Sequence, residues 1–289
     1  MSEATPAPLV HSVFHLTDFS PSCDVAFAHA LAIALVRRSS LTLLHAGEAD
    51  LDTDWRRFPA VRATLERWGL LEPGSDRSAV FEQFAVSVKK VNLGTARPVS
   101  TVLDYLTGEP SDLIVVAYDA QKGITGVARD SVAEDVARRS GAMTLFVPSG
   151  ASGFVSARDG SLSLRRILVP IAEEPAPVLA VEASRRVARG LGDPPVDVTM
   201  LNIGDGNAPV IALPDEDEGT LRYRQVQRGG DVVDGILAAA DEFDADLVAM
   251  VTNGRSSLSE IVRGSHTERV VRRARCPVLS LPEAWSQRV

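Results

Sequence analysis

The segment that decides the fold is DLIVVAYDAQKGITGVARDSVAEDVARRSGAMTLFVP, residues 112–148, because it returns later in the chain. Residues 246–282 read DLVAMVTNGRSSLSEIVRGSHTERVVRRARCPVLSLP and align with it without a gap, at a constant offset of 134 residues. The identical positions include Asp112/Asp246, Leu113/Leu247, Ser131/Ser265, Glu134/Glu268, Val136/Val270, Arg138/Arg272, Arg139/Arg273, Leu145/Leu279 and Pro148/Pro282. A repeat of this length is too long for a solenoid unit and indicates two related domains in tandem.

Around this repeat, apolar runs alternate with helix-like stretches in both halves. In the first half we expect strands over 13–17, 41–46, 84–93, 112–117 and 143–147, and helices over 21–38, 55–68, 97–106 and 131–140. In the second half we expect strands over 165–171, 196–203, 221–228, 246–252 and 277–281, and helices over 176–191, 231–243 and 265–275. Strands that alternate with helices predict a parallel sheet covered on both faces. The predicted fold is therefore α/β, with two tandem doubly wound domains, each a five-stranded, mainly parallel sheet with helices on both faces.

The domain boundaries follow from the composition. We assign residues 10–149 to the first domain, residues 150–163, rich in Gly and Ser, to a linker, and residues 164–283 to the second domain. The offset between the halves falls from 154 at their first strands to 134 at their ends, so the second domain lacks 20 residues. They are missing where the first domain has its 55–68 helix. The acidic stretch 204–219, with DEDE at 215–218, stands in its place and is typical of a solvated loop rather than a metal site.

Composition excludes several classes of protein. A net charge of −8 on 289 residues argues against a general nucleic-acid binder, which needs a cationic surface. No apolar run reaches the roughly 20 residues that cross a bilayer, and the first residues do not resemble a signal peptide. Only two cysteines, Cys23 and Cys276, are present. They indicate reduced thiols and a cytoplasmic location rather than a disulfide framework.

A candidate ligand site lies after the fourth strand of the second half. Doubly wound sheets bind ligands outside the carboxyl ends of their strands, where the strand order reverses. There, Gly254 would let a ligand approach the backbone, and Gly264 and Ser265 open a helix whose free N–H groups favour phosphate. Asn253 and Arg255 complete the predicted nucleotide-binding set. A simple turn at the glycines, and a capping box from Ser265 to Glu268, are the structural alternatives.

Catalytic signatures are missing from the sequence. The five histidines are scattered, and neither a nucleophile elbow nor a Walker-type phosphate loop is present. We therefore predict no catalytic residue and no metal ligand, and we expect His266 to be an exposed residue of the last helix.

The chain resembles the universal stress proteins over roughly residues 10–148 and 164–282. The family's G-x2-G-x9-G-[S/T] loop corresponds to Val251, Gly254, Gly264 and Ser265, with Val251 in place of the first glycine. The family's E-x-V and CPV-like segments correspond to residues 268–270 and 276–278. The first half opens with LTDFS at 16–20, similar to the family's first strand and its Asp, whereas the second half has Ala172 at that place.

This resemblance implies a tandem member of the family and an asymmetry between its halves. Some members bind ATP or AMP at the loop. In the first half the loop positions are Ala117, Ala120 and Asp130, and a carboxylate at Asp130 would repel phosphate. We therefore expect ATP or AMP to bind, if at all, in the second half.

The function implied by the resemblance is stress-response regulation and binding, without strong catalysis. The halves are expected to form an intramolecular pseudo-dimer through their last strands, which leaves a further homodimer open. Two alternatives remain: a nucleotide-cleaving enzyme of a related α/β fold, and an interaction protein with vestigial nucleotide sites.

Overall fold

The computed structural model describes residues 10–47, 55–118, 132–151, 153–174, 176–204, 208–209, 211, 220–252 and 266–282. The first half contains β1 (Ser12–Leu16), α1 (Cys23–Arg37), β2 (Ser40–Gly47), η1 (Trp55–Arg57), α2 (Val61–Arg67), α3 (Ala79–Phe84), β3 (Val88–Gly94), α4 (Pro98–Gly108), β4 (Leu113–Tyr118), α5 (Val132–Ser140) and β5 (Met143–Pro148). The second half contains β6 (Leu164–Ile171), α6 (Pro177–Leu191), β7 (Gly192–Ile203), β8 (Leu221–Arg228), α7 (Val232–Glu242), β9 (Leu247–Thr252), α8 (His266–Val271) and β10 (Val278–Pro282). The predicted α/β class is confirmed.

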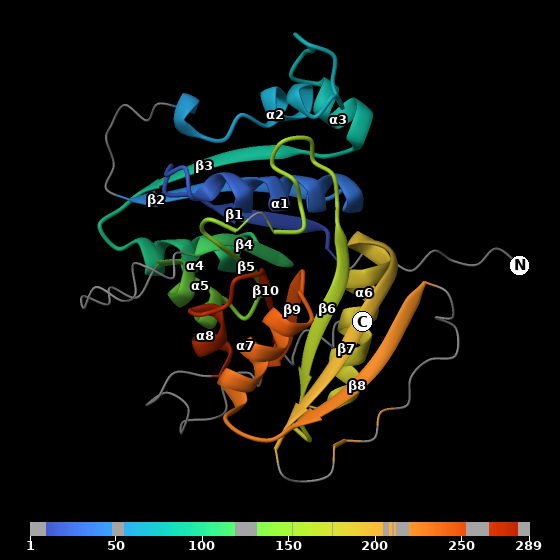
Figure 1. Cartoon of the computed structure of the whole chain (residues 1–289). Helices are drawn as coiled ribbons and strands as arrows, with labels where there is room; N and C mark the ends of the chain where they lie inside the picture. The colour runs from blue at the N-terminus through green and yellow to red at the C-terminus, as the bar shows by residue number, and fades with distance from the viewer. Residues whose placement is uncertain are drawn as a thin grey trace, which may run out of the picture.

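The ten strands of the described residues form one sheet, in the order β3-β2-β1-β4-β5-β10-β9-β6-β7-β8. Each half contributes five strands, as predicted, and within each half every neighbouring pair is parallel. The halves meet where β5 and β10 pair antiparallel. From either outer edge inward, the strand order is the same, so the second half repeats the first about this junction (Figure 1).

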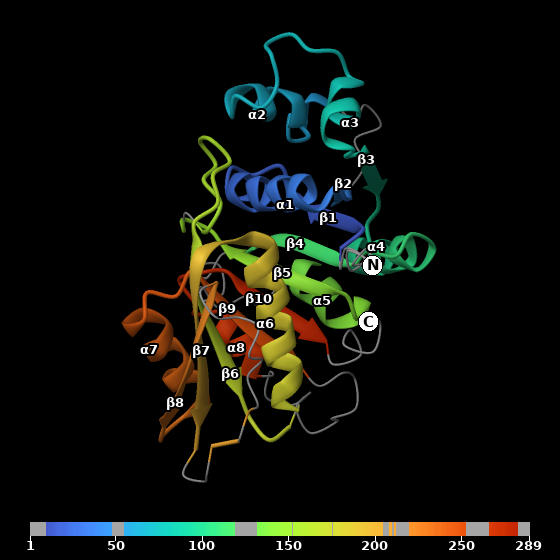
Figure 2. The same cartoon turned by 90° about the vertical axis from the view of Figure 1, so that its right-hand side faces the viewer.

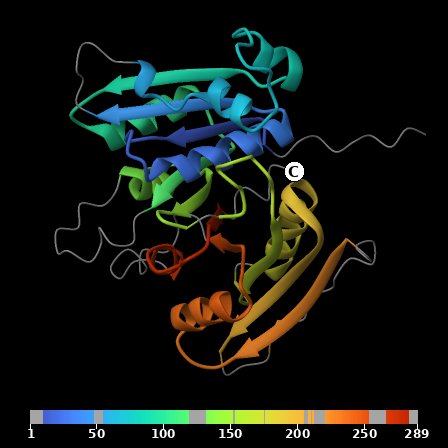
Figure 3. The ribbon, with the colours of Figure 1, turned by 45° about the horizontal axis from the view of Figure 1, so that its top comes forward.

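Helices cover both faces of the sheet. One face carries α1 and α6 together with the 150–163 linker, and the other carries α4, α5, α7 and α8. The two helices of the first face come from different halves and touch, since Arg37 Nη2 donates to the carbonyl of Arg186 at 3.3 Å. In Figure 3 the blue-to-green half lies above the yellow-to-red half. The sheet is continuous between them.

The segment between β2 and β3 differs from the prediction. A single helix over 55–68 was expected, but the chain forms the short η1 and then α2, with Pro59 in the break between them. The strand expected from Phe84 begins only at Val88, because Phe84 ends α3 and Ala85 takes a left-handed conformation. Figure 2 shows α2 and α3 together beyond α1, at the outer end of the first half.

The linker packs closely against the first half, which its composition did not predict. Phe154 and Val155 are buried, and Val155 pairs with Leu162 in a small antiparallel turn. His29 on α1 holds this turn, because its Nε2 accepts the backbone N–H groups of Phe154 and Val155 at 3.1 and 3.3 Å. The other ring nitrogen, Nδ1, lies 2.7 Å from the carbonyl of Val25, so it carries the proton.

Candidate functional site

The predicted nucleotide-binding residues Asn253, Gly254, Arg255, Gly264 and Ser265 lie outside the described residues, as does the corresponding first-half stretch, 119–131. The structure describes what flanks them in the second half. β9 ends at Thr252, whose hydroxyl lies 3.4 Å from the carbonyl of Leu281, and α8 begins at the exposed His266. Glu268 on α8 forms an ion pair with Arg272, one turn later, at 3.1 Å.

At the carboxyl ends of β6 and β7, the described residues include three exposed positions and one buried amide. Ala172, Glu173 and Glu174 follow β6 directly, and all three are exposed. Beside them, the Asn202 side-chain amide on β7 donates to the carbonyl of Ile171 at 3.2 Å. These groups lie at the carboxyl ends of neighbouring parallel strands, the edge at which doubly wound sheets bind their ligands.

At the same edge of the first half, Asp18 organises the start of α1. Its Oδ1 accepts the backbone N–H of Ser20 at 2.9 Å and lies 3.2 Å from the thiol of Cys23. The carboxylate that the family resemblance singled out is therefore bonded to its own turn. Burial raises the pKa of the Cys23 thiol, which favours its uncharged form.

An aromatic stack fills the space next to Asp18. The ring of Phe19 stacks on His45 from β2, with 4.0 Å between ring centroids, and meets the edge of Phe58 at 5.0 Å. The guanidinium of Arg57 lies 4.7 Å from the centre of the Phe19 ring, and Trp55 stacks on Phe58 at 5.5 Å. Sequence reasoning did not assign these residues to a site, because no spacing rule links position 19 to positions 45 and 58.

The two halves share one contact at this edge. His45 Nδ1 lies 2.8 Å from the carbonyl of Thr17, and Asn202 makes the corresponding bond to Ile171. Strand register supports the equivalence: Val13 pairs with Leu41 in the first half, and Ile167 pairs with Val198 in the second. His45 and Asn202 each lie four residues beyond these partners. A polar side chain thus bonds a carbonyl at the carboxyl end of the first strand in both halves.

Two histidines, His15 and His29, are buried in the core. His15 Nδ1 bonds the carbonyl of Val115 at 3.1 Å, and burial lowers the pKa of His15 to about 4. Burial also lowers the pKa of His29 to about 4. Both rings are therefore neutral at pH 7.

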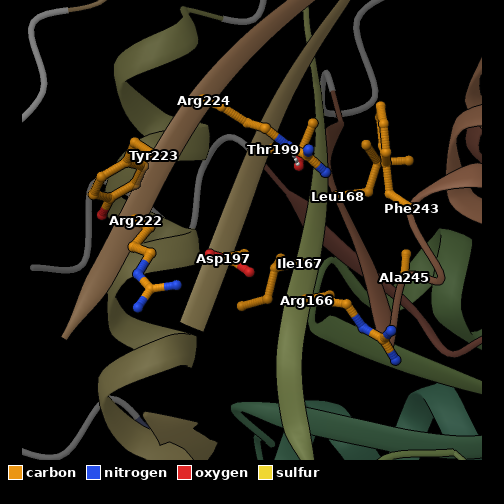
Figure 4. A pocket seen from close by; sticks show the side chains of 10 residues that line it. All are labelled: Arg166, Ile167, Leu168, Asp197, Thr199, Arg222, Tyr223, Arg224, Phe243 and Ala245. Carbon is orange, nitrogen blue, oxygen red and sulfur yellow. Dashed lines mark hydrogen bonds between the residues drawn. The ribbon is translucent and has the colours of Figure 1, made fainter. Parts of the chain in front are cut away.

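A cavity of about 170 Å³ opens on the α7 side of β6, β7 and β8 (Figure 4). Two arginines that line the cavity are bonded to neighbouring side chains. Arg166 pairs with Asp246 at 3.0 Å, and Arg224 donates to the Thr199 hydroxyl at 2.7 Å. The same Arg224 guanidinium lies 4.1 Å from the centre of the Phe243 ring. The cavity is lined from the amino-terminal parts of β6 and β8, away from the crevice at their carboxyl ends.

Both cysteines, Cys23 and Cys276, are free thiols, as predicted. Among the described residues, no group of three His, Cys, Asp or Glu side chains is placed to hold a metal ion. No helix in the described ranges is long and apolar enough to cross a membrane.

The repeat and its fold identify the family. A model of the universal stress protein family matches residues 13–148 and, a second time, residues 163–282. The chain belongs to the universal stress protein family. It is a tandem two-domain member, because the two matched segments coincide with the two halves of the sheet.

Solved structures support this assignment at the level of the fold. A universal stress protein from Archaeoglobus fulgidus DSM 4304 is 17% identical with a TM-score of 0.61, over 94% of this chain and 96% of that one. A putative universal stress protein from Pseudomonas aeruginosa UCBPP-PA14 is 13% identical with a TM-score of 0.59, over 98% of each chain. A functionally unknown protein from Pseudomonas aeruginosa PAO1 is 13% identical with a TM-score of 0.55, over 96% and 95%. Comparison with curated proteins gives no match.

Proposed function

We propose that this universal stress protein is a regulatory and binding protein of the stress response, and that its second half binds an adenine nucleotide, ATP or AMP. Strong catalysis is not part of the proposal. Family membership supports the stress role, and this support is an analogy between related proteins rather than a property of one site. The nucleotide is argued from the residues of the chain itself.

One observation carries the nucleotide proposal: the halves differ at matched positions of the repeat. Gly264 in the second half corresponds to Asp130 in the first, and Gly254 corresponds to Ala120. A glycine at the start of a helix leaves the backbone N–H groups accessible to phosphate, whereas a carboxylate there repels it. Ala172 and Glu173, which follow β6, the neighbour of β9 in the sheet, are exposed.

The test is calorimetric titration of ATP and AMP into the native protein and two matched variants. Gly264→Asp places in the second half the carboxylate of the first, and Asp130→Gly does the reverse. Loss of a hydrogen bond to a charged group costs about 1.5–3 kcal/mol. We therefore expect Gly264→Asp to weaken binding by about tenfold or more, and Asp130→Gly to leave the second-half affinity unchanged. Native affinity in Gly264→Asp would place the nucleotide elsewhere.

An interaction protein with vestigial nucleotide sites is the second candidate. It is favoured by Val251 and Ala172, which replace a glycine of the loop and the opening Asp of the family. Mass spectrometry of the natively purified protein separates the two candidates, because a retained adenine nucleotide supports binding. Absence of binding at millimolar ATP would favour the vestigial sites. Phosphate release from ATP, lost in Gly264→Asp, would instead support the nucleotide-cleaving enzyme.

The remaining parts of the proposal concern assembly and location. We propose that the β5–β10 junction replaces the interface of a two-chain dimer, so that the halves act as a pseudo-dimer. A further homodimer remains open, and sedimentation equilibrium of the full chain tests for it. The two free thiols are consistent with a cytoplasmic location, which localisation of a tagged protein would test.

A further inference from the structure

We propose that the crevice of the first half is closed by the chain's own aromatic side chains, with Phe19 and Phe58 as the residues that exclude a ligand. The inference concerns the first half alone. It does not require that the second half bind a nucleotide.

The aromatic stack of Phe19, His45 and Phe58 lies at the carboxyl ends of β1 and β2. In the first half β1 lies between β2 and β4, and this is where the strand order reverses. Ligands of doubly wound sheets bind outside the carboxyl ends of the strands at such a point. Phe19 comes three residues after β1 ends, and His45 lies near the carboxyl end of β2. Their stacked rings therefore occupy the edge at which a ligand would enter.

The backbone of Phe19 also supports the closure. Its φ angle is +64°, a left-handed conformation that is uncommon for a bulky residue. Strain of this kind persists only where surrounding contacts enforce it, and it occurs preferentially at functional sites. Here the enforcing contacts are the stack on His45, the edge of Phe58 and the guanidinium of Arg57. The chain therefore maintains a strained backbone conformation that holds the Phe19 ring against His45 and Phe58.

The ring that supports Phe19 is that of Phe58, which comes from the connection between β2 and β3. Trp55, Arg57 and Phe58 all belong to the segment between β2 and β3 that carries η1, α2 and α3. Phe58 is buried, with 2% of its surface exposed, so its position is fixed by the core. The second half lacks the 20 residues that the first half has in this part of the chain. The longer connection is thus what supplies the support for the stack.

Comparison of matched positions supports the closure as well. Counted from the aligned first strands, Phe19 corresponds to Glu173, which is exposed. His45 corresponds to Asn202, which keeps the bond to the carbonyl but offers no ring for stacking. Two aromatic groups in one half are matched by an acid and an amide in the other. The described residues therefore close one crevice and leave the other without this stack.

A photoaffinity probe tests the closure directly. 8-Azidoadenosine carries the flat base without phosphate, so its entry does not depend on a phosphate loop. The probe would be photolysed with the native full chain, with Phe19→Gly/Phe58→Ala, and with Phe81→Ala as the control. Phe81 lies exposed on α3 of the same segment and is not part of the stack. Peptide mapping would then locate the label.

We expect native protein and Phe81→Ala to show only background label on the peptides that contain Thr17 or Gly47, and the double variant to exceed that background at least tenfold. Glycine accepts the left-handed φ at position 19, so the single Phe19→Gly variant is the second test if the double variant fails to fold. Label above background on these peptides in the native protein would overturn the closure, and so would a folded variant that gains none. Label on second-half peptides reports separately on the proposed nucleotide site.

Discussion

Leu145 and Leu279, which occupy the same position in the two repeats, face each other across the antiparallel β5–β10 junction. On either side, Thr144 pairs with Ser280 and Phe146 with Val278. In the repeat, Thr144 corresponds to Val278 and Phe146 corresponds to Ser280. Superposing one half on the other therefore converts each flanking pair into the other pair. A pseudo-twofold axis therefore passes through the leucine pair, as in a symmetric dimer interface whose two copies lie in one chain.

This symmetry predicts that Leu145→Ala and Leu279→Ala have similar costs. Both leucines are buried in the same core cluster, and truncation of a buried leucine costs about 2–5 kcal/mol. We expect the two losses in the free energy of unfolding, measured by urea denaturation, to agree within about 1 kcal/mol. Each substitution removes one side chain of the same symmetric leucine pair.

The junction also predicts one cooperative unfolding transition, because the sheet is continuous and α1 touches α6 across it. Circular dichroism and tryptophan fluorescence should report coincident midpoints. Two resolved transitions in the native protein would show that the halves unfold independently and would contradict a shared core.

A second pair of repeated residues, Asp112 and Asp246, accepts hydrogen bonds from the backbone at the start of the first strand of each half. Asp112 Oδ2 accepts the N–H groups of His11 and Ser12 at 2.7 and 3.1 Å. Asp246 Oδ2 accepts those of Arg165 and Arg166 at 2.9 and 2.8 Å. The repeat therefore conserves a carboxylate that satisfies strand-end donors in both halves.

We predict that Asp246→Ala lowers the free energy of unfolding by about 1.5–3 kcal/mol, the usual loss for hydrogen bonds to a charged group. Asp244→Asn is the matched control, because Asp244 reaches Arg166 only at 3.5 Å and is largely exposed, and because Asn tolerates the left-handed φ of +46° at this position. It should change stability by less than about 0.5 kcal/mol. Equal effects of the two substitutions, in urea denaturation, would show that the backbone bonds of Asp246 add nothing.

Some features of the fold could be predicted from the sequence, and others could not. The repeat predicted the α/β class and the tandem organisation, because periodic apolar runs and a constant offset are properties of local sequence. It did not predict that Phe154 and Val155 would be buried, since Gly and Ser neighbours give a loop-like composition. The Phe19–His45–Phe58 stack was also missed, because it depends on which distant segments meet. Asn253, Gly254, Arg255, Gly264 and Ser265 lie outside the described residues, so their roles remain predictions.

The two thiols should react slowly in the folded protein. Burial raises the pKa of Cys276 to about 12 and also raises the pKa of Cys23, so little thiolate is present near pH 8. We expect alkylation by iodoacetamide to be at least tenfold slower in the native protein than in urea, as followed by intact mass. Fast native alkylation of one cysteine would show that its burial is not maintained in solution.

The last prediction concerns acid. His29 is neutral in the folded protein because burial lowers its pKa from 6.5 to about 4, and its unprotonated Nε2 accepts two linker N–H groups. The unfolded chain binds a proton below pH 6.5 while the folded chain does not, so stability is full above pH 6.5 and is lost as the pH falls toward 4. One such histidine contributes at most about 1.4 kcal/mol per pH unit. His15 titrates in the same direction, so the slope of the native protein contains both.

His29→Gln separates the two contributions, because the amide oxygen can accept a linker N–H but takes up no proton in this range. We expect the variant to be less stable than the native protein at pH 7, where one of two bonds is lost, and to lose less stability between pH 6.5 and 4.5. Urea denaturation at four pH values measures both effects. An unchanged pH slope in His29→Gln would mean that His29 does not titrate against folding. The acid sensitivity would then have to come from His15 and the carboxylates, and the contact between α1 and the linker would be independent of pH.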